Sequence, residues 1–333
     1  MISPAASDSS FSGSRVLITG GLGFIGSNLG RRLVHAGADV CLVDSLVPEY
    51  GGNFFNVQDY AQRVQINISD VRDRHSFRHL VEGRDFLFNL AGQTSHWDSM
   101  EDPFTDLEIN CRAQLSILET CRHFNPRVRV VFASTRQLYG KPDYLPVDEK
   151  HLLRPVDING INKMAGEQYH ILFNKVYGLH TCALRLTNTY GPGMRIKDAR
   201  QTFLGVWIRQ IFEGTPIEVW EGEQQRDFNF VDDAVEALLL AAQRPEAAGE
   251  IFNLGATEVV DLRTLAEQLI AAHGSGSFRQ CSFPEERKRI DIGNYYADFG
   301  LIQRTLGWSP RVGLKEGLQK TVEFYRRNYP HYV

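Results

Sequence analysis

The sequence predicts an α/β protein built on a doubly wound parallel sheet. From Arg15 onward, short apolar runs alternate with segments of helical length, a rhythm that places helices on both faces of a parallel sheet. A glycine-rich turn joins the first apolar run to the first helical segment, and the alternation ends near residue 193. We therefore expect a large parallel-sheet domain and a smaller α/β domain assembled from non-contiguous pieces.

The first half of the chain contains most of the expected strands. They are rich in Val, Ile, Leu and Phe and are bounded by Gly or Asp, as buried strands are. In chain order we expect them at residues 15–20, 39–44, 64–70, 85–92, 127–134 and within 179–193. Helices are expected at 24–37, where Gly37 ends the helix, at 104–124 and at 155–170.

After residue 193 the pattern becomes mixed. We expect helices at 201–214, 261–274 and 314–329, a strand at 216–220, a strand followed by a helix within 227–243, and a charged loop at 284–291. Three parts follow from this pattern. They are a flexible leader at 1–14, a larger domain from 15–192 with about 227–260, and a smaller domain from about 193–226 and 261–333.

The composition argues against several classes of protein. A formal net charge of −4 over 333 residues provides no electrostatic reason to bind nucleic acid or a membrane surface. No apolar run approaches the ~20 residues that span a bilayer, and the Ser-rich N-terminus lacks the apolar segment of a secretory signal. The five cysteines show neither a CxxC pair nor a metal-ligand spacing, so we expect reduced thiols, no metal and a cytoplasmic protein.

The glycine-rich turn indicates a dinucleotide site. Gly20, Gly23 and Gly26 stand between the first strand and the first helix, where they permit a tight turn and close approach to a pyrophosphate at the helix N-terminus. Asp44 ends the next strand, 18 residues after Gly26, where a carboxylate accepts hydrogen bonds from the adenosine ribose. Asp44 would repel a 2′-phosphate, and no Arg or Lys follows in residues 45–50 to compensate. The sequence therefore predicts NAD rather than NADP.

Further motifs extend this pattern along the chain. They are GxxGxxG from Gly20, DVRD at 70–73, NLAGQ at 89–93, SMEDP at 99–103, a Thr before LYG, Lys163, LRLTNTYGPG at 184–193, RDFNFVDD at 226–233 and YADFGLIQRTLGW at 296–308. Taken in order, from about Arg15 to the C-terminus, they resemble the extended short-chain dehydrogenases/reductases. More narrowly, the chain is similar to NAD-dependent nucleotide-sugar epimerases and dehydratases, which implies a Rossmann-type domain and a nucleotide-diphosphate (NDP) sugar as substrate.

The resemblance implies roles for individual residues. Those implied to contact the cofactor are Gly20, Gly23, Phe24, Ile25, Gly26, Asp44, Asp70, Val71, Leu90, Ala91, Gly92 and Lys163. Thr135 is implied to contact the sugar, and Asn188 and Arg226 the diphosphate, for which a guanidinium fork is well suited. Arg289 is a candidate second diphosphate contact, together with its neighbours Arg287 and Lys288; a solvated run of charge explains this segment equally well.

The catalytic positions contain one departure from the family. In the family a Ser or Thr, a Tyr and a Lys cooperate, and the Tyr removes a hydroxyl proton. Thr135 and Lys163 match two of these positions, but Asn159 stands where the Tyr is expected. Asn cannot ionise, and Tyr169 lies ~15 Å further along the helix and roughly 280° around it. We therefore consider Lys163 first and His96 second as the proton acceptor.

A second departure follows Thr135 directly. Sugar 4,6-dehydratases of the family carry an Asp-Glu pair there, whereas this chain has Arg136 and Gln137. Neither residue can serve as the carboxylate acid or base, so 4,6-dehydration is disfavoured. Arg136 is instead a candidate contact for an anionic substrate group, such as a uronate carboxylate or a phosphate. An outward-facing Arg is the alternative.

Together these features predict an NDP-sugar epimerase that works by transient oxidation and hydride return. Two alternatives stay open: another NDP-sugar reaction of decarboxylase or dehydratase type, and a catalytically silent NAD- and NDP-sugar-binding protein. Asn159 is either natural or a substitution introduced for Tyr. The resemblance also implies a homodimer through a four-helix bundle, formed by the helix with Asn159 and the helix at 104–124. Candidate apolar contacts are Leu107, Ile109, Leu115, Ile117 and Leu118.

Overall fold

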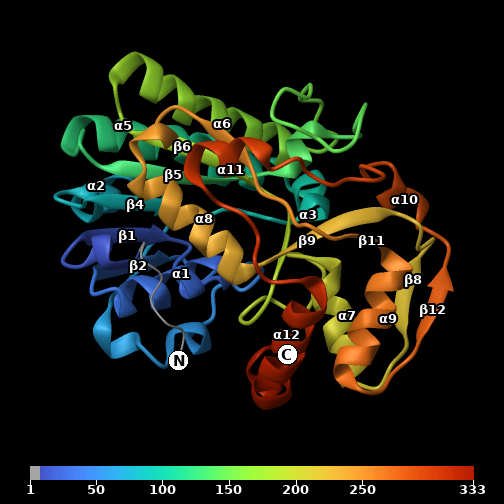
Figure 1. Ribbon diagram of the computed structural model, residues 1–333. Coiled ribbons are helices and arrows are strands. Elements are labelled where there is room, and N and C mark those ends of the chain that lie inside the picture. Colours follow the sequence, from blue (N-terminus) through green and yellow to red (C-terminus); the bar gives the residue numbers. More distant parts are fainter. Residues whose placement is uncertain (1–7) are drawn as a thin grey trace.

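A seven-stranded sheet forms the centre of the molecule. The computed structural model describes residues 8–333 (Figure 1). The strand order is β10-β6-β5-β4-β1-β2-β3, and every neighbouring pair is parallel. The strands are β1 (Arg15–Thr19), β2 (Asp39–Asp44), β3 (Gln65–Ile68), β4 (Phe86–Asn89), β5 (Arg129–Thr135), β6 (Thr181–Leu186) and β10 (Ile251–Asn253). The predicted doubly wound α/β fold is confirmed.

Helices cover both faces of this sheet, which explains the continuous apolar strands. One layer contains α2 (Arg74–Val81), α5 (Ala113–Phe124) and α6 (Ile158–Tyr177); the other contains α1 (Phe24–His35) and α8 (Val231–Gln243), as Figure 1 shows. Successive β1 residues alternate between the two layers: Leu17 packs with Phe77 and Ile117, whereas Val16 and Ile18 belong to the opposite core. Each strand therefore needs apolar residues at every position.

The helical segment at residues 96–124, which packs against α6, is interrupted by a wider turn. After α3 (His96–Glu101) come α4 (Pro103–Leu107), a π-helical turn over Glu108–Arg112, and then α5. Helix α6 begins at the N-cap Asp157, which accepts a hydrogen bond from the Gly160 amide, and ends at Gly178 with φ of 71°. The π-turn matters for the site because inserted residues of this kind re-aim nearby side chains.

The C-terminal half adds two small sheets beside the large one. The first contains β7 (Asn188–Tyr190), β9 (Gln225–Phe230) and β11 (Val259–Asp261), and the second contains β8 (Ile217–Trp220) and β12 (Phe278–Cys281). Helices α7 (Phe203–Phe212), α9 (Leu262–His273) and α12 (Leu314–Asn328) pack around them. Helix α11 (Gly300–Leu306), expected in the smaller domain, packs against β10 of the large sheet. The domain division as a whole stays a prediction.

Two expectations about local structure need correction. The leader predicted at 1–14 is too long: residues 1–7 lie outside the described residues, but the Phe11 side chain is fully buried and packs edge-on against Phe86. The apolar ring at Phe11 is what anchors this segment to the core. The charged loop expected at 284–291 contains a short helix, α10 (Glu285–Lys288). Within residues 8–333, no helix is long and apolar enough to cross a membrane.

Candidate active site

A pocket of about 480 Å³ opens beyond the carboxyl ends of β1, β2, β4, β5 and β6. This is the edge at which parallel α/β sheets bind ligands, because the loops leaving the strands diverge there. The predicted site residues that line it are Gly20, Gly23, Phe24, Ile25, Gly26, Asp44, Asp70, Val71, Leu90, Ala91, Gly92, His96, Thr135, Arg136, Asn159, Lys163, Asn188 and Arg226. The exception is Arg289, which is exposed and does not line the pocket.

The glycine turn is compatible only with glycine at its tightest points. Gly20 has φ of +69°, a conformation that other residues rarely adopt. A Cβ placed on Gly26 would lie 2.2 Å from the Gly20 carbonyl oxygen. Helix α1 starts directly after Gly23 with no side-chain cap, so its first backbone amides face the pocket. Such a helix end attracts phosphate.

Asp44 lies at the end of β2 with acceptor capacity to spare. Its Oδ2 accepts from the Leu22 amide at 3.1 Å and its Oδ1 from the Leu46 amide at 3.0 Å. Burial raises the pKa of this carboxyl, and the two amides oppose that rise. A carboxylate offers about four acceptor positions, so a ribose diol can still be bound. The turn and Asp44 therefore fit a dinucleotide.

Lys163 is buried and lines the pocket. Its ammonium Nζ donates a hydrogen bond to the Ala133 carbonyl at 3.1 Å and lies 5.0 Å from the centre of the Phe132 ring. Burial lowers the pKa of Lys163 to about 8, and the Asp106 carboxylate opposes the fall. A Cβ on Gly92 would lie 2.9 Å from Nζ. Gly92 therefore makes room for the lysine.

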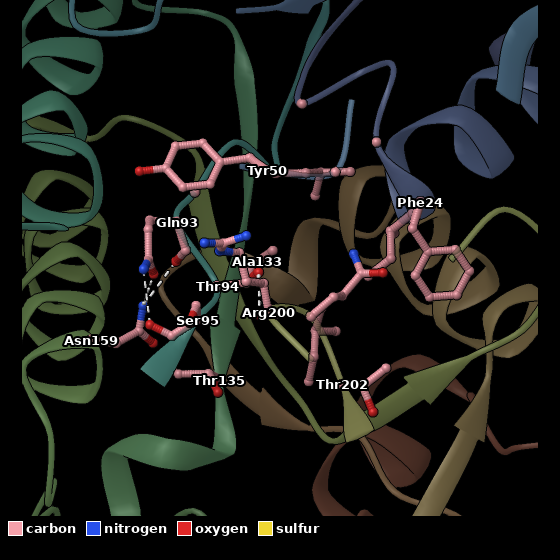
Figure 2. A pocket seen from close by; sticks show the side chains of 18 of the residues that line it. Phe24, Tyr50, Gln93, Thr94, Ser95, Ala133, Thr135, Asn159, Arg200 and Thr202 are labelled. Atoms are coloured by element: carbon pink, nitrogen blue, oxygen red, sulfur yellow. Dashed lines mark hydrogen bonds between the residues drawn. The ribbon is translucent and has the colours of Figure 1, made fainter. Parts of the chain in front are cut away.

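Asn159 is held in a buried polar cluster rather than left free in the pocket. Its side-chain Nδ2 donates to the Gln93 carbonyl at 2.8 Å and to the Asp106 carboxylate at 3.0 Å (Figure 2 shows the bonds to Gln93). The same carboxylate accepts from the amides of Asn110 at 3.0 Å and Asn162 at 2.8 Å. An amide donor completes this cluster around Asp106, so Asn159 has a structural function that the sequence alone did not reveal.

His96 lies beside a buried carboxylate that the sequence did not single out. Its Nδ1 is 3.1 Å from Asp157 Oδ2, but the approach is too bent for a hydrogen bond; the His96 side chain is 38% exposed and that of Asp157 is fully buried. Asp157 also accepts from the Gly160 amide at 2.6 Å and from Gln137 Nε2 at 2.7 Å. Burial raises the pKa of Asp157, but these donors and His96 lower it overall.

Four arginines line the pocket, and two of them, Arg136 and Arg226, are among the predicted substrate contacts. Arg226 is buried; it donates to the carbonyls of Gln225 and Gly293, and its Nη2 lies 3.3 Å from Asp291. Asn188 Oδ1 accepts from Arg136 Nη2 at 2.7 Å. From the charged run at 284–291, Arg287 lines the pocket in place of the predicted Arg289.

The comparisons with known proteins agree with this geometry. A sequence model of the NAD dependent epimerase/dehydratase family matches residues 16–255. The chain belongs to this family. It is 31% identical to a putative UDP-glucose 4-epimerase of Methanocaldococcus jannaschii, over 94% of this chain and 99% of the relative.

Two solved structures extend the likeness. The structure of UDP-glucose 4-epimerase from Thermotoga maritima with UDP-glucose superposes with a TM-score of 0.86 at 28% identity, covering 95% of this chain and 99% of that one. MoeE5, solved with UDP-glucuronic acid and NAD, superposes at 0.82 with 29% identity, covering 95% of this chain and all of that one. NAD is the cofactor of the epimerase/dehydratase family, and the prediction of NAD is confirmed.

This family member also carries a set of ion pairs around the pocket that the sequence did not indicate. Arg195 pairs with Asp198 at 2.6 Å and donates to the Tyr50 carbonyl, while Arg200 pairs with Asp98 at 2.6 Å. The segment 195–200 is thereby joined to the loop after β2 and to α3, and Tyr50 and Arg200 line the pocket (Figure 2). Tyr169, already excluded by helix geometry, does not line the pocket.

Proposed function

We propose that the protein is an NDP-sugar epimerase that oxidises one sugar carbon and returns the hydride to the opposite face. One observation carries this proposal: Thr135 and Lys163 line the same pocket as the glycine turn and Asp44. A sugar hydroxyl held by Thr135 would therefore lie beside the cofactor. The names of the relatives, UDP-glucose 4-epimerase and UDP-glucuronate 4-epimerase among them, support the substrate class.

Thr135 and Lys163 divide the proton chemistry between them. Thr135 Oγ1 accepts from the Gln137 amide at 3.2 Å, so its hydroxyl hydrogen is available to donate to the substrate oxygen. Lys163, with its pKa lowered to about 8, is partly neutral near physiological pH and accepts the hydroxyl proton. When bound, NAD accepts the hydride of the sugar carbon and later returns it. Arg226 and Asn188 hold the diphosphate.

His96 is the second candidate for the proton acceptor. Its Nδ1 lies 3.1 Å from the buried Asp157 carboxylate, which would stabilise a protonated imidazole electrostatically. Lys163 ranks first because its amine lies deep in the pocket, next to Ala133 at the end of the strand that carries Thr135. Two rival functions differ from epimerisation: another reaction on an NDP-sugar, and a silent binding protein in which Asn159 has ended catalysis.

We also propose that the protein is cytoplasmic. The five cysteines are unpaired in the structure, as expected in a reducing compartment.

The first test is turnover of a panel of UDP-, dTDP- and CDP-sugars by the NAD-loaded protein in deuterated water, with products identified by NMR. We expect inversion at one carbon. Absence of deuterium at that carbon would indicate return of the same hydride, and deuterium at the neighbouring carbon would indicate enolisation. Loss of carbon dioxide or water would instead support the first rival. Tight NAD binding without turnover of any sugar would support the silent binding protein.

We also propose a homodimer formed by α5 and α6 with the segment before them. The predicted contact residues need correction: Ile109, Ile117 and Leu118 are buried in the core, and only Leu107 and Leu115 are exposed. The exposed large apolar and aromatic residues on these helices are Phe104, Leu107, Leu115, Phe124, Ile161, Leu172, Val176 and Tyr177. Positions 161, 172 and 176 share one face of α6 at 100° per residue, and an apolar face of this kind favours a second copy as its partner.

The dimer proposal predicts the effect of a charge on this face. Leu172, 47% exposed, should tolerate glutamate in a monomer, whereas the charge would be buried without a partner in the dimer. We expect sedimentation velocity to show a dimer for the wild type and a monomer for Leu172→Glu. A control glutamate at exposed Val259, away from these helices, should leave the dimer intact. A monomeric wild type would contradict the proposal.

A further inference from the structure

Arg136 is a cation in the pocket without a counter-ion. Among residues 8–333, the structure pairs it with no carboxylate, and its Nη1 is buried with no hydrogen-bond partner. The one side-chain acceptor that it does have is the neutral amide of Asn188, at 2.7 Å from Nη2. Buried charges are costly unless paired. A guanidinium group that forms no ion pair and has a buried nitrogen without a hydrogen-bond partner indicates that an anion binds beside it.

The surroundings of Arg136 accept an anion more readily than a second cation. Its guanidinium carbon lies 5.2 Å from the centre of the Tyr295 ring, and the neighbouring Arg226 adds positive charge. Burial lowers the pKa of Arg136, against the opposing effects of Tyr295, Asp227 and Asp291. Arg226 differs from Arg136 because two carbonyls and Asp291 already surround it. Of these two guanidinium groups, that of Arg136 is the one that forms no ion pair within residues 8–333.

We propose that Arg136 binds a carboxylate carried by the sugar itself, which makes a nucleotide-linked hexuronate the preferred substrate. The inference rests on the proposed function and specifies its substrate class. Thr135 and Arg136 are consecutive residues at the end of β5, so the group that Arg136 meets lies beside the carbon whose hydroxyl Thr135 holds. The relatives' names give a 4-epimerase, and we take C4 as the reacting carbon. In a hexuronate, the carboxylate is close to C4, whereas the diphosphate on C1 is across the ring from it. A guanidinium matches a planar carboxylate in shape as well as charge.

The test compares two substrates that differ only at C6, UDP-glucuronate and UDP-glucose. For Arg136→Met, which keeps an unbranched apolar stem, is shorter than arginine and removes the charge, we expect kcat/KM for UDP-glucuronate to fall by about 10- to 100-fold, the usual size of a lost charged hydrogen bond. Activity with UDP-glucose should change less than about threefold on the same scale. Equal losses with the two substrates, or no loss with either, would overturn the proposal.

Binding measurements separate the possible sources of the anion. The inhibition constant of UDP should be unchanged in Arg136→Met; an increase would place the diphosphate on Arg136 and overturn the proposal. The unfolding temperature without ligand should not fall, because the variant loses a partly buried charge that forms no ion pair within residues 8–333. UDP-glucuronate should raise the unfolding temperature of the wild type more than that of the variant. Arg74→Met, at an exposed position on α2, is the surface control.

The same experiments distinguish failure of the inference from failure of the proposed function. If the wild type turns over neither of these sugars nor any other member of the panel, the epimerase proposal fails, and the thermal shift with UDP-glucuronate still decides whether Arg136 binds the carboxylate. If UDP-glucose is epimerised and Arg136→Met alters neither the kinetics nor the thermal shift, the epimerase proposal holds and the role of Arg136 is refuted.

Discussion

Replacing Lys163 with methionine should lower turnover of the sugar nucleotide by about 10²–10⁴-fold, the usual cost of losing a general base. The side chain is buried in the pocket and donates its hydrogen bond to the Ala133 carbonyl. With Asn159 bound to Gln93 and Asp106, Lys163 is the group best placed to accept the proton. Initial rates with the preferred sugar, together with the amount of NAD bound per chain, measure the effect.

The pH dependence distinguishes a base from a residue that only binds. A neutral amine is the active form, and the pKa of Lys163 is about 8, so kcat/KM of the wild type should rise with pH through this value. In Lys163→Met that rise should disappear. If Lys163→Met loses activity only because it binds NAD weakly, added NAD should restore the activity. The restored kcat/KM would then rise with pH as in the wild type, and this result would contradict the assignment of Lys163 as the base.

The free energies of unfolding of the wild type and of Lys163→Met should also depend differently on pH. The folded-state pKa of Lys163 is lowered to about 8 from 10.5, so between these values the folded chain binds fewer protons than the unfolded chain. The free energy of unfolding therefore gains a contribution that rises with pH across this window. Urea unfolding at two pH values inside the window should show this rise in the wild type and not in Lys163→Met.

If His96→Asn instead abolishes activity and Lys163→Met does not, the acceptor is His96.

Glu167→Gln should lower the free energy of unfolding by about 3–5 kcal/mol. This is the largest effect on stability that we expect from a single substitution. The Glu167 and Arg185 side chains are 0% and 3% exposed, and Arg185 Nη2 lies 2.6 Å from Glu167 Oε1. Glu167 Oε2 also accepts from Ser134 Oγ at 2.7 Å. Glutamine has the same shape but leaves the guanidinium of Arg185 buried without a counter-charge. Chemical unfolding followed by circular dichroism measures the loss.

Two further variants test the explanation for Glu167. Glu82 forms an exposed ion pair with Arg78 at 3.2 Å, and Glu82→Gln should cost less than about 1 kcal/mol because water screens such pairs. Combining Glu167→Leu with Arg185→Met removes both buried charges and should recover much of the loss. If the double variant is less stable than Glu167→Gln, packing rather than the unpaired charge explains the effect.

The parts of the site that the sequence predicted are those carried by short, continuous segments. The glycine turn needs residues only six positions apart, and Asp44 follows from the strand that ends there, so backbone geometry places them together. The exclusion of Tyr169 needed no more than the pitch of one helix. Thr135 and Lys163 were identified through the resemblance to the family; both line the pocket, and their catalytic roles stay predictions.

The parts that the sequence did not reveal depend on contacts between distant segments. Gln93 and Asp106 meet Asn159 from 66 and 53 positions away, and no periodicity reports such a contact. The dimer face was misjudged for a related reason. Ile117 and Leu118 face the core because they continue the helical spacing of the buried positions 106, 109, 110, 113 and 114, and apolar character alone does not distinguish a core face from an interface.

The sequence by itself determined the fold class, the family and the cofactor, because apolar periodicity and the glycine turn act through neighbouring residues along the chain. Only the tertiary structure decided which groups Asn159 and Arg136 contact. Asn159 has its amide bound by Gln93 and Asp106, whereas Arg136 has no carboxylate partner within residues 8–333. Whether a polar group is paired is set by packing between elements that are far apart in the sequence, since a buried charge responds to whichever groups surround it in space.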